Sequence, residues 1–190
     1  MSSASLDEVA KDNLGVAPHS LVARVFHWGF VFVFAYGLAK QVDEVEELED
    51  RAFLVEEIVF ATIFLAILLA RFVYMRTTRP TALPIGTAKT VSRLARFVHL
   101  GMYLSLAMLG VTGLTIGGMF ASGTREGMIF ASMLWAHEAF YWASVNLIVV
   151  HVLGALYHRY LGDGVWSSMV PMFREKNTPT VVDRRLARNQ

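Results

Sequence analysis

Histidine is the residue type in this chain with the clearest potential for chemistry, because most of its histidines lie inside long apolar segments. The chain of 190 residues has six histidines and no cysteine. Only His19 lies clearly outside the apolar segments; the other five are His27, His99, His137, His151 and His158. An ionisable side chain at membrane depth is costly and marks a functional site by default. These five histidines are therefore the first candidates for a site.

Imidazole is the usual axial ligand of non-covalently bound haem, and this is the chemistry that the residue types favour. The absence of cysteine excludes disulfides, thiolate-held iron–sulfur clusters, thiolate zinc sites and haem attached through a CxxCH motif. Each histidine also has a structural interpretation. His27 can form an interfacial pair with Trp28, His99 can donate a hydrogen bond across a bundle, and His158 can be a polar residue at a helix end.

The spacing of the histidines predicts which of them share a level in the membrane. His137 and His151 are fourteen residues apart, which is a rise of about 21 Å on nearly one face of a helix. In a hydrocarbon core about 30 Å thick, one of them lies near each surface. His158 continues the same stripe. The positions of His27 and His99 in their own segments place both at the level of His151, with His137 alone at the other level.

Four apolar segments must position these side chains: 22–39, 52–74, 94–117 and 128–160. Hydrophobic residues make up 55% of the chain and charged residues 17%, whereas soluble domains have roughly 25% charged residues. Each segment reaches or approaches the length of about 20 residues that crosses a bilayer. An open sheet edge cannot face lipid, so helices are favoured over strands. The sequence predicts an all-α fold: an integral membrane four-helix up-down bundle at 21–161, flanked by cytoplasmic segments at 1–20 and 162–190.

Lysine and arginine are distributed unevenly between the two ends of the predicted bundle. Both termini and the 75–93 loop share one side, which carries fourteen basic residues: Lys11, Arg24, Arg71, Arg76, Arg79, Lys89, Arg93, Arg96, Arg159, Arg174, Lys176, Arg184, Arg185 and Arg188. The opposite side carries three: Lys40, Arg51 and Arg125. Because basic loops stay in the cytoplasm, both termini are expected there. The net charge of only +1 gives no reason to expect a nucleic-acid partner.

With the histidines placed, residues 20–172 resemble the bacterial cytochrome b561 family, four-helix membrane proteins of the inner membrane that bind two haem b groups. The resemblance is carried by the His27–Trp28 pair, by LLARFVYMR (68–76) and by the proline-bearing loop after it. It continues through HLGMYL (99–104), WAHE (135–138) with His151 after it, and YHRYL (157–161). It implies that His27 and His151 hold a haem near the cytoplasmic side, and that His137 holds an outer haem with a histidine of the second segment.

The second segment departs from the family pattern, because it contains no histidine and Glu57 stands where one is expected. Carboxylate is a hard ligand and a poor substitute for imidazole on low-spin iron. Three outcomes follow. The outer haem is lost and His137 pairs with Glu57 or Glu56, or the haem is five-coordinate on His137, or Met119 or Met133 replaces the missing ligand.

The resemblance also implies a function, electron exchange between haem and a quinone such as ubiquinone, and one branch of the family is similar to superoxide oxidases. His99, His158, Arg24 and Arg96 are the residues expected to line the inner site, as partners of haem propionates or as proton relays. The alternative is an accessory subunit of a larger respiratory or photosynthetic membrane complex with one haem or none. The acidic segment 43–50 is either a docking face for a basic periplasmic cytochrome or simply a solvated loop.

Overall fold

The protein folds as a bundle of long helices. The computed structural model describes residues 20–40, 45–78, 88–170 and 172. About 89% of these residues are helical, and none of them is in a strand. The helices are α2 (Leu21–Ala39), the short 3-10 helix η1 (Val45–Glu49), α3 (Arg51–Thr78), α4 (Lys89–Ala121), α5 (Met128–Leu161) and α6 (Val165–Met169). The all-α prediction is confirmed.

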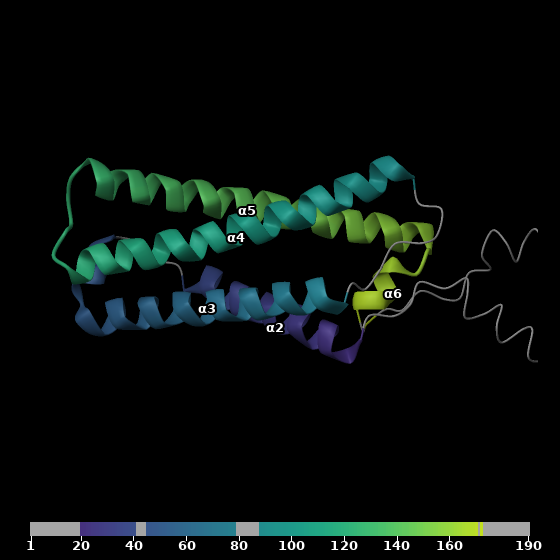
Figure 1. Ribbon diagram of the computed structural model, residues 1–190, viewed down its shortest axis with the longest axis horizontal. Helices are drawn as coiled ribbons and strands as arrows, with labels where there is room; N and C mark the ends of the chain where they lie inside the picture. The colour runs from purple at the N-terminus through teal and green to yellow at the C-terminus, as the bar shows by residue number, and fades with distance from the viewer. Residues whose placement is uncertain (1–19, 41–44, 79–87, 171, 173–190) are drawn as a thin grey trace, which may run out of the picture.

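Helices α2, α3, α4 and α5 are each long and apolar enough to cross a membrane, as predicted. They run up and down, so that each packs against the next along the chain: α2 on α3, α3 on α4, and α4 on α5. Figure 1 shows η1 and the 122–127 connection at one end of the bundle and α6 at the other. The start of α2, the end of α3 and the start of α4 lie at the α6 end.

Local signals explain where the helices begin and end. The Ser20 hydroxyl accepts a hydrogen bond from the Ala23 amide at 3.1 Å, which caps the start of α2. Asp50 caps α3 in the same way through the Ala52 amide at 2.8 Å. Gly162 has φ 65° and ends α5 in the left-handed conformation that favours glycine. The third predicted segment, 94–117, is longer in the structure, because the polar residues before Leu94 continue the helix from Lys89.

Glycines let α3 and α4 approach closely. A Cβ atom added at Gly110 would lie 2.7 Å from Cδ2 and Cγ of Leu65, and one added at Gly117 would lie 2.8 Å from Cγ1 of Ile58. Small residues at such positions allow membrane helices to pack by van der Waals contact. One apolar cluster fills the middle of the bundle: Phe30, Phe64, Leu68 and Leu106. A second lies near η1: Leu48, Leu54, Ile116, Phe120 and Phe130.

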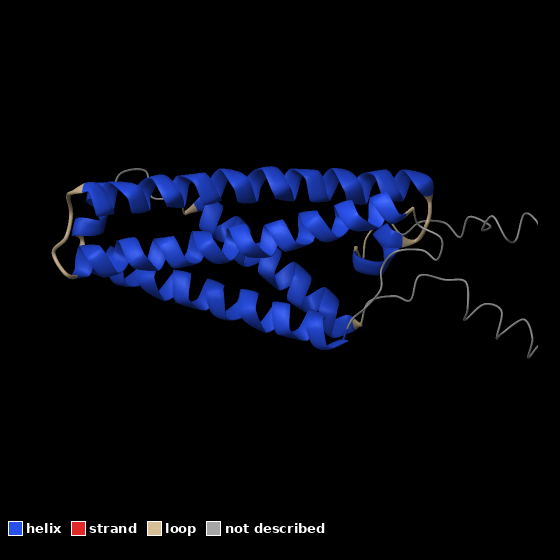
Figure 2. Ribbon diagram, turned by 45° about the horizontal axis from the view of Figure 1, so that its top comes forward, coloured by secondary structure: helices blue, strands red, loops and turns tan. Residues whose placement is uncertain are grey.

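Figure 2 shows the described part of the chain as helices joined by loops, and the outer faces of these helices are apolar as well. Large side chains on the outer helix faces are well exposed, among them Phe32, Phe97 and Leu104. A helix that is hydrophobic all round must be surrounded by protein or lipid, since water would not tolerate so much apolar surface. The exposed faces of the four helices are therefore the surface that the lipid bilayer covers.

Helix α6 is an element that the sequence did not predict, because residues 162–190 were expected to form a tail. The Asp163 carboxylate accepts a hydrogen bond from the Val165 amide at 3.2 Å and starts this helix. The predicted segments at 1–19 and 173–190, the proline-bearing loop at 79–87 and the first part of the acidic segment 43–50 lie outside the described residues.

Candidate functional site

Three histidines from three helices come together toward the α6 end of the bundle. The ring centroids of His27 on α2 and His151 on α5 are 6.4 Å apart, with an interplanar angle of 64°. His99 on α4 is beside them, with its ring centroid 5.0 Å from that of His151. These are the three histidines that the depth argument assigns to one level. The structure therefore brings that predicted set into one cluster.

Arg71 also belongs to this cluster. It comes from α3, so that all four spanning helices contribute a residue. Its Nη2 atom is 2.9 Å from Nδ1 of His27. Its guanidinium carbon lies 5.8 Å from the ring centroid of Phe30 and 5.8 Å from that of Tyr103. The guanidinium is thus held against two aromatic rings at the level of the histidines, a favourable arrangement for a cation.

The second nitrogen of His99 is available to a ligand. Its Nδ1 atom lies 2.6 Å from the carbonyl oxygen of Ala95, one turn earlier on the same helix. A carbonyl oxygen only accepts, so Nδ1 carries the proton and donates it. In the neutral ring the lone pair of His99 is therefore on Nε2, and the side chain is exposed beside His151.

His137 lies apart from this cluster, on the far half of α5. Its Nδ1 atom is 3.0 Å from the hydroxyl oxygen of Thr112 on α4. That hydroxyl also lies 2.8 Å from the carbonyl oxygen of Met108 and 3.0 Å from that of Leu109, which take its single proton. The Thr112 oxygen therefore accepts from His137 Nδ1. Gly113 leaves room for the ring, since a Cβ atom there would be 3.2 Å from His137 Cε1.

The residues predicted to pair with His137 in the absence of haem, and those predicted to replace the missing haem ligand, have other contacts in the structure. Lys40 Nζ lies 2.7 Å from a carboxylate oxygen of Glu56 and 2.8 Å from one of Glu57. Burial alone would lower the pKa of Lys40, but the hydrogen bonds and charges of the two carboxylates outweigh it and raise that pKa above its ordinary value. Met119 and Met133 pack against the apolar cluster near η1.

Arg24 and His158, both expected to line the inner site, instead make contacts at the end of the bundle. Arg24 Nε donates to the Ser168 carbonyl of α6 at 3.0 Å. His158 Nδ1 lies 2.6 Å from a carboxylate oxygen of Asp163, just past the end of α5. Arg96 Nε lies 3.4 Å from the Ser92 carbonyl of its own helix. The His158 contact holds the turn from α5 into α6, and the Arg24 contact joins α6 to α2.

Trp28 adds a second bond between α2 and α6, because its indole Nε1 donates to the Met169 carbonyl at 3.1 Å. Helix α6 therefore connects the end of α5 to α2 right beside His27. The sequence offered no signal for this contact, since Trp28 is equally typical of a residue at a membrane interface.

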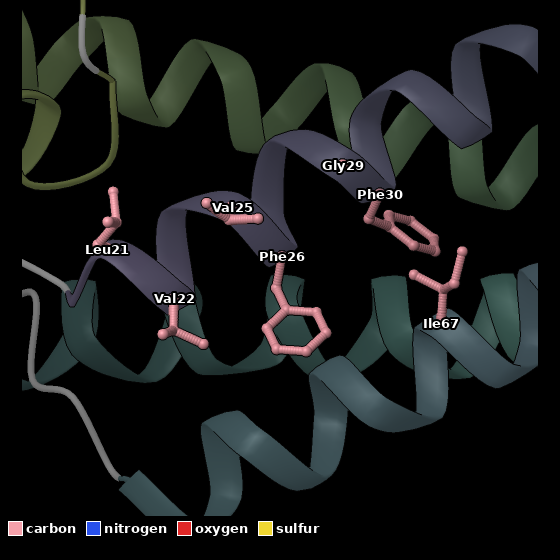
Figure 3. A pocket seen from close by; sticks show the side chains of 7 residues that line it. All are labelled: Leu21, Val22, Val25, Phe26, Gly29, Phe30 and Ile67. Atoms are coloured by element: carbon pink, nitrogen blue, oxygen red, sulfur yellow. The ribbon is translucent and has the colours of Figure 1, made fainter.

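An apolar groove runs along the outer side of α2 and α3. Residues of α2 between 21 and 30 line it, together with Ile67 of α3. Figure 3 shows Phe26 and Phe30 pointing from α2 toward α3 on this side. The lining contains none of the candidate histidines, so the groove is separate from the histidine cluster and faces the lipid surface. Phe30 is common to both, because it also lies against Arg71.

Comparison with protein families identifies the chain. A family model described as prokaryotic cytochrome b561 matches residues 18–172. The chain belongs to this family. Comparison with curated proteins and with solved structures gave no match. Membership of the cytochrome b561 family confirms the resemblance seen in the sequence and makes the chain a bacterial membrane protein that binds haem b and transfers electrons.

The residues of the histidine cluster fit the haem of a cytochrome b561. Two imidazole nitrogens at about 2 Å from one metal ion place their ring centroids about 6 Å apart. The 6.4 Å between His27 and His151 agrees with that distance. The 5.0 Å between His99 and His151 is shorter than a bridging metal requires. His27 and His151 are therefore the pair that can hold iron between them, with His99 as a neighbour.

The sequence analysis overlooked Arg71 as a site residue and counted it only among the basic residues of its side. A signal was present, because Arg71 is the only lysine or arginine in the apolar segment 52–74. A charged residue at that depth marks a functional position by default, as the histidines do. Thr112 gave no such signal, since threonine is common in membrane helices and its role depends on facing His137.

Proposed function

We propose that His27 and His151 hold one haem b toward the α6 end of the bundle and that this haem exchanges electrons with the quinone pool. The observation that supports it is the 6.4 Å separation of the two imidazole rings, which come from the first and last spanning helices. Family membership implies the cofactor, and the ring separation supports His27 and His151 as its ligands.

A single haem per chain is the proposed stoichiometry. His137 is the only histidine of the outer level, and its contacts among the described residues are with α4. Glu57, at the position of the missing histidine, is paired with Lys40. A carboxylate that neutralises a lysine is a poor candidate for an iron ligand, because ligation would leave the ammonium group without that partner.

Bound haem iron accepts or gives up one electron at a time. Oxidation of one quinol to quinone releases two electrons and two protons, so it reduces two ferric haems, one on each of two chains, and each of the two protons needs an acceptor. His99 is the proposed acceptor of one proton at each transfer, because Nε2 of the neutral ring carries a lone pair beside His151. The apolar groove between α2 and α3 is a suitable surface for an isoprenoid tail, since its lining is hydrophobic and Phe30 links it to the cluster.

The proposed location is the inner membrane, with the α6 end of the bundle in the cytoplasm. Arg76, Lys89, Arg93 and Arg159 belong to the helix ends on that side. Glu46, Glu49 and Asp50 belong to the opposite end. Basic residues on the cytoplasmic side are the rule for membrane proteins of this kind.

An accessory subunit of a larger membrane complex is the second candidate function. The ion pair between Lys40 and Glu57 favours it, because Glu57 then does not bind an outer haem. A single haem leaves about half of the membrane without a redox centre. In that case a partner must take the electrons onward. The acidic end around η1 would suit a basic cytochrome, although Glu49 is already paired with Arg125 at 2.9 Å.

The test is a haem count on the purified full chain and on His151→Ala. The pyridine haemochrome assay is expected to give close to one haem per wild-type chain and close to none for the variant. Quinol added to the wild-type protein is expected to reduce the haem, and the variant is expected to show no reduced α-band. The matched control is His158→Gln on the same helix, whose partner Asp163 lies in the turn to α6, and it should keep its haem.

The alternatives give different results. Two haems per wild-type chain would contradict the proposed loss of the outer site. A single haem that quinol does not reduce would favour the accessory subunit. Retention of the α-band in His151→Ala would exclude His151 as a ligand.

A further inference from the structure

Arg71 is a charged residue well inside a membrane-spanning helix. It precedes the last residue of α3, Thr78, by seven positions, which is about 10 Å along a helix. Its side chain turns into the bundle, where it contacts His27, Phe30 and Tyr103. At such a place a guanidinium is costly unless an anion or several hydrogen-bond acceptors compensate it.

Those contacts supply no negative charge. Phe30 presents an aromatic ring, Tyr103 presents a ring and an uncharged hydroxyl that bonds to Arg71, and His27 presents a ring nitrogen. Among the described residues, the ion pairs within 4.0 Å involve Lys40, Arg125 and His158, and none involves Arg71. The described part of the site therefore has a fixed positive charge and lacks the anion that would balance it.

The bond to His27 is also incompatible with the ligand role of that residue. A guanidinium has only donors, so Nδ1 of His27 must accept the bond from Arg71. A neutral imidazole that accepts at Nδ1 carries its proton on Nε2. Ligation through Nε2 requires the opposite tautomer, with the proton on Nδ1 and the lone pair on Nε2. Arg71 cannot remain bonded to Nδ1 when His27 binds iron in that way.

We propose that Arg71 leaves His27 when haem binds and pairs instead with a haem propionate, so that it is the anion-binding residue of this site. This inference rests on the proposed function, because it requires His27 as a ligand. It accounts for both observations together, since the propionate supplies the missing negative charge and the departure of Arg71 releases Nδ1 of His27. The rings of Phe30 and Tyr103 keep the guanidinium at the level of the cluster during the exchange.

Guanidinium and carboxylate are complementary in shape as well as in charge. Two parallel N–H groups of arginine can bind the two oxygens of one carboxylate, which makes this pair stronger and more directional than a point charge. Haem b carries its carboxylates on the same molecule as the iron. Ligation by His27 and binding by Arg71 are therefore expected to reinforce each other.

The experiment compares two porphyrins in the full-length chain: haem b and its dimethyl ester, in which both carboxylates are esterified. Binding of each is titrated by the low-spin absorption of the ferric form. The wild-type chain is expected to bind haem b more tightly than the ester by about tenfold to hundredfold, the range for a charge-assisted hydrogen bond. In Arg71→Gln this ratio should fall by about tenfold.

Arg76→Gln is the matched control, because Arg76 is on the same helix and is exposed, with its guanidinium carbon 6.0 Å from the Phe72 ring. It should keep the wild-type ratio. Equal binding of the two porphyrins by the wild-type chain would overturn the proposal whatever the variants do. An equal loss of both porphyrins in Arg71→Gln would also overturn it, because Arg71 would then support His27 and not a carboxylate.

A second variant covers a folding failure, and the wild-type spectrum separates this proposal from the one on which it rests. If Arg71→Gln does not fold, Arg71→Lys takes its place, since lysine keeps the charge and loses the paired N–H groups. Its ratio must then fall below the wild-type value, and an unchanged ratio overturns the proposal. Absence of a low-spin spectrum with either porphyrin in the wild-type chain means that the histidine pair itself is not a haem site, and both proposals then fail.

Discussion

At the scale of single residues, the partner of each Nδ1 atom decides what a histidine can do. His99 and His137 each have an oxygen acceptor at Nδ1, from Ala95 and Thr112 respectively. An acceptor at that position leaves the Nε2 lone pair free for a ligand or a proton. His27 has a donor there instead, and the proposed role of Arg71 in binding haem rests on this difference.

Thr112→Val tests the contact at the outer histidine. Valine has the shape of threonine without the hydroxyl, so Nδ1–H of His137 would lose the acceptor that lies 3.0 Å away. The Leu109 backbone also bonds to His137 and remains in the variant, so the loss is that of one hydrogen bond, about 0.5–1.5 kcal/mol. We expect the free energy of unfolding to fall by about that amount, measured by SDS denaturation of the purified protein in detergent micelles.

Thr115→Val is the control for this substitution. Thr115 is on the same helix and is exposed, and within the described part of the chain its hydroxyl bonds to the Val111 carbonyl at 2.8 Å. Its replacement should change the stability by no more than about 0.5 kcal/mol. Equal effects at positions 112 and 115 would mean that the hydroxyl of Thr112 does not support His137.

The depth of each histidine could be predicted from the sequence, whereas its partners could not. The rise per residue places His27, His99 and His151 at one level, and the structure brings them together. The same periodicity puts His158 on the stripe of His151, but Asp163 in the following turn bonds to it. Arg71 contacts His27 because α3 is rotated so that this side chain faces α2. Periodicity alone does not determine that rotation.

At the scale of elements, the close packing of α4 against α3 depends on glycines at particular positions of α4. Gly110 faces Leu65 of α3 so closely that a methyl group would lie 2.7 Å from its Cδ2 and Cγ atoms. Because Cγ is near the backbone, Leu65 cannot turn away cheaply. At Gly118 of the same helix, a methyl group would meet nothing within 4 Å. The two glycines therefore have different roles.

Alanine at these two positions is expected to change the stability in opposite directions. Gly110→Ala should destabilise the bundle by about 1–3 kcal/mol through overpacking. Gly118→Ala should stabilise it by about 0.5 kcal/mol, because alanine loses less backbone entropy than glycine in a helix. SDS denaturation curves of the two variants measure both effects. Two variants with the same sign would contradict the close contact between α3 and α4.

The long helices could be predicted from hydropathy, and the short ones could not. Four apolar segments of nearly spanning length leave few alternatives in lipid, so α2, α3, α4 and α5 were expected within a few residues. Helix α6 has five residues, too few for a periodic pattern to show. Contacts with α2 hold it, through Arg24 and Trp28, and no local sequence signal reports such contacts.

At the scale of the whole molecule, the two ends of the bundle differ in charge. The end with α6 carries Arg76, Lys89 and Arg93, whereas the end with η1 carries Glu46, Glu49 and Asp50. Such a difference gives the bundle a preferred direction in the membrane, because basic segments resist translocation. In the proposed orientation, the histidine cluster lies toward the cytoplasmic side and His137 toward the outer side.

The orientation can be measured directly because the chain has no cysteine of its own. A single cysteine is introduced as Glu46→Cys in η1 or as Lys89→Cys at the start of α4, both exposed positions at opposite ends of the bundle. In intact spheroplasts, a maleimide that cannot cross membranes should label position 46 and leave position 89 unlabelled. After permeabilisation it should label both, which shows that each thiol is reactive. The reverse pattern would place the proposed haem near the outer surface, and a quinone reaction at this haem would then release its protons outside the cell.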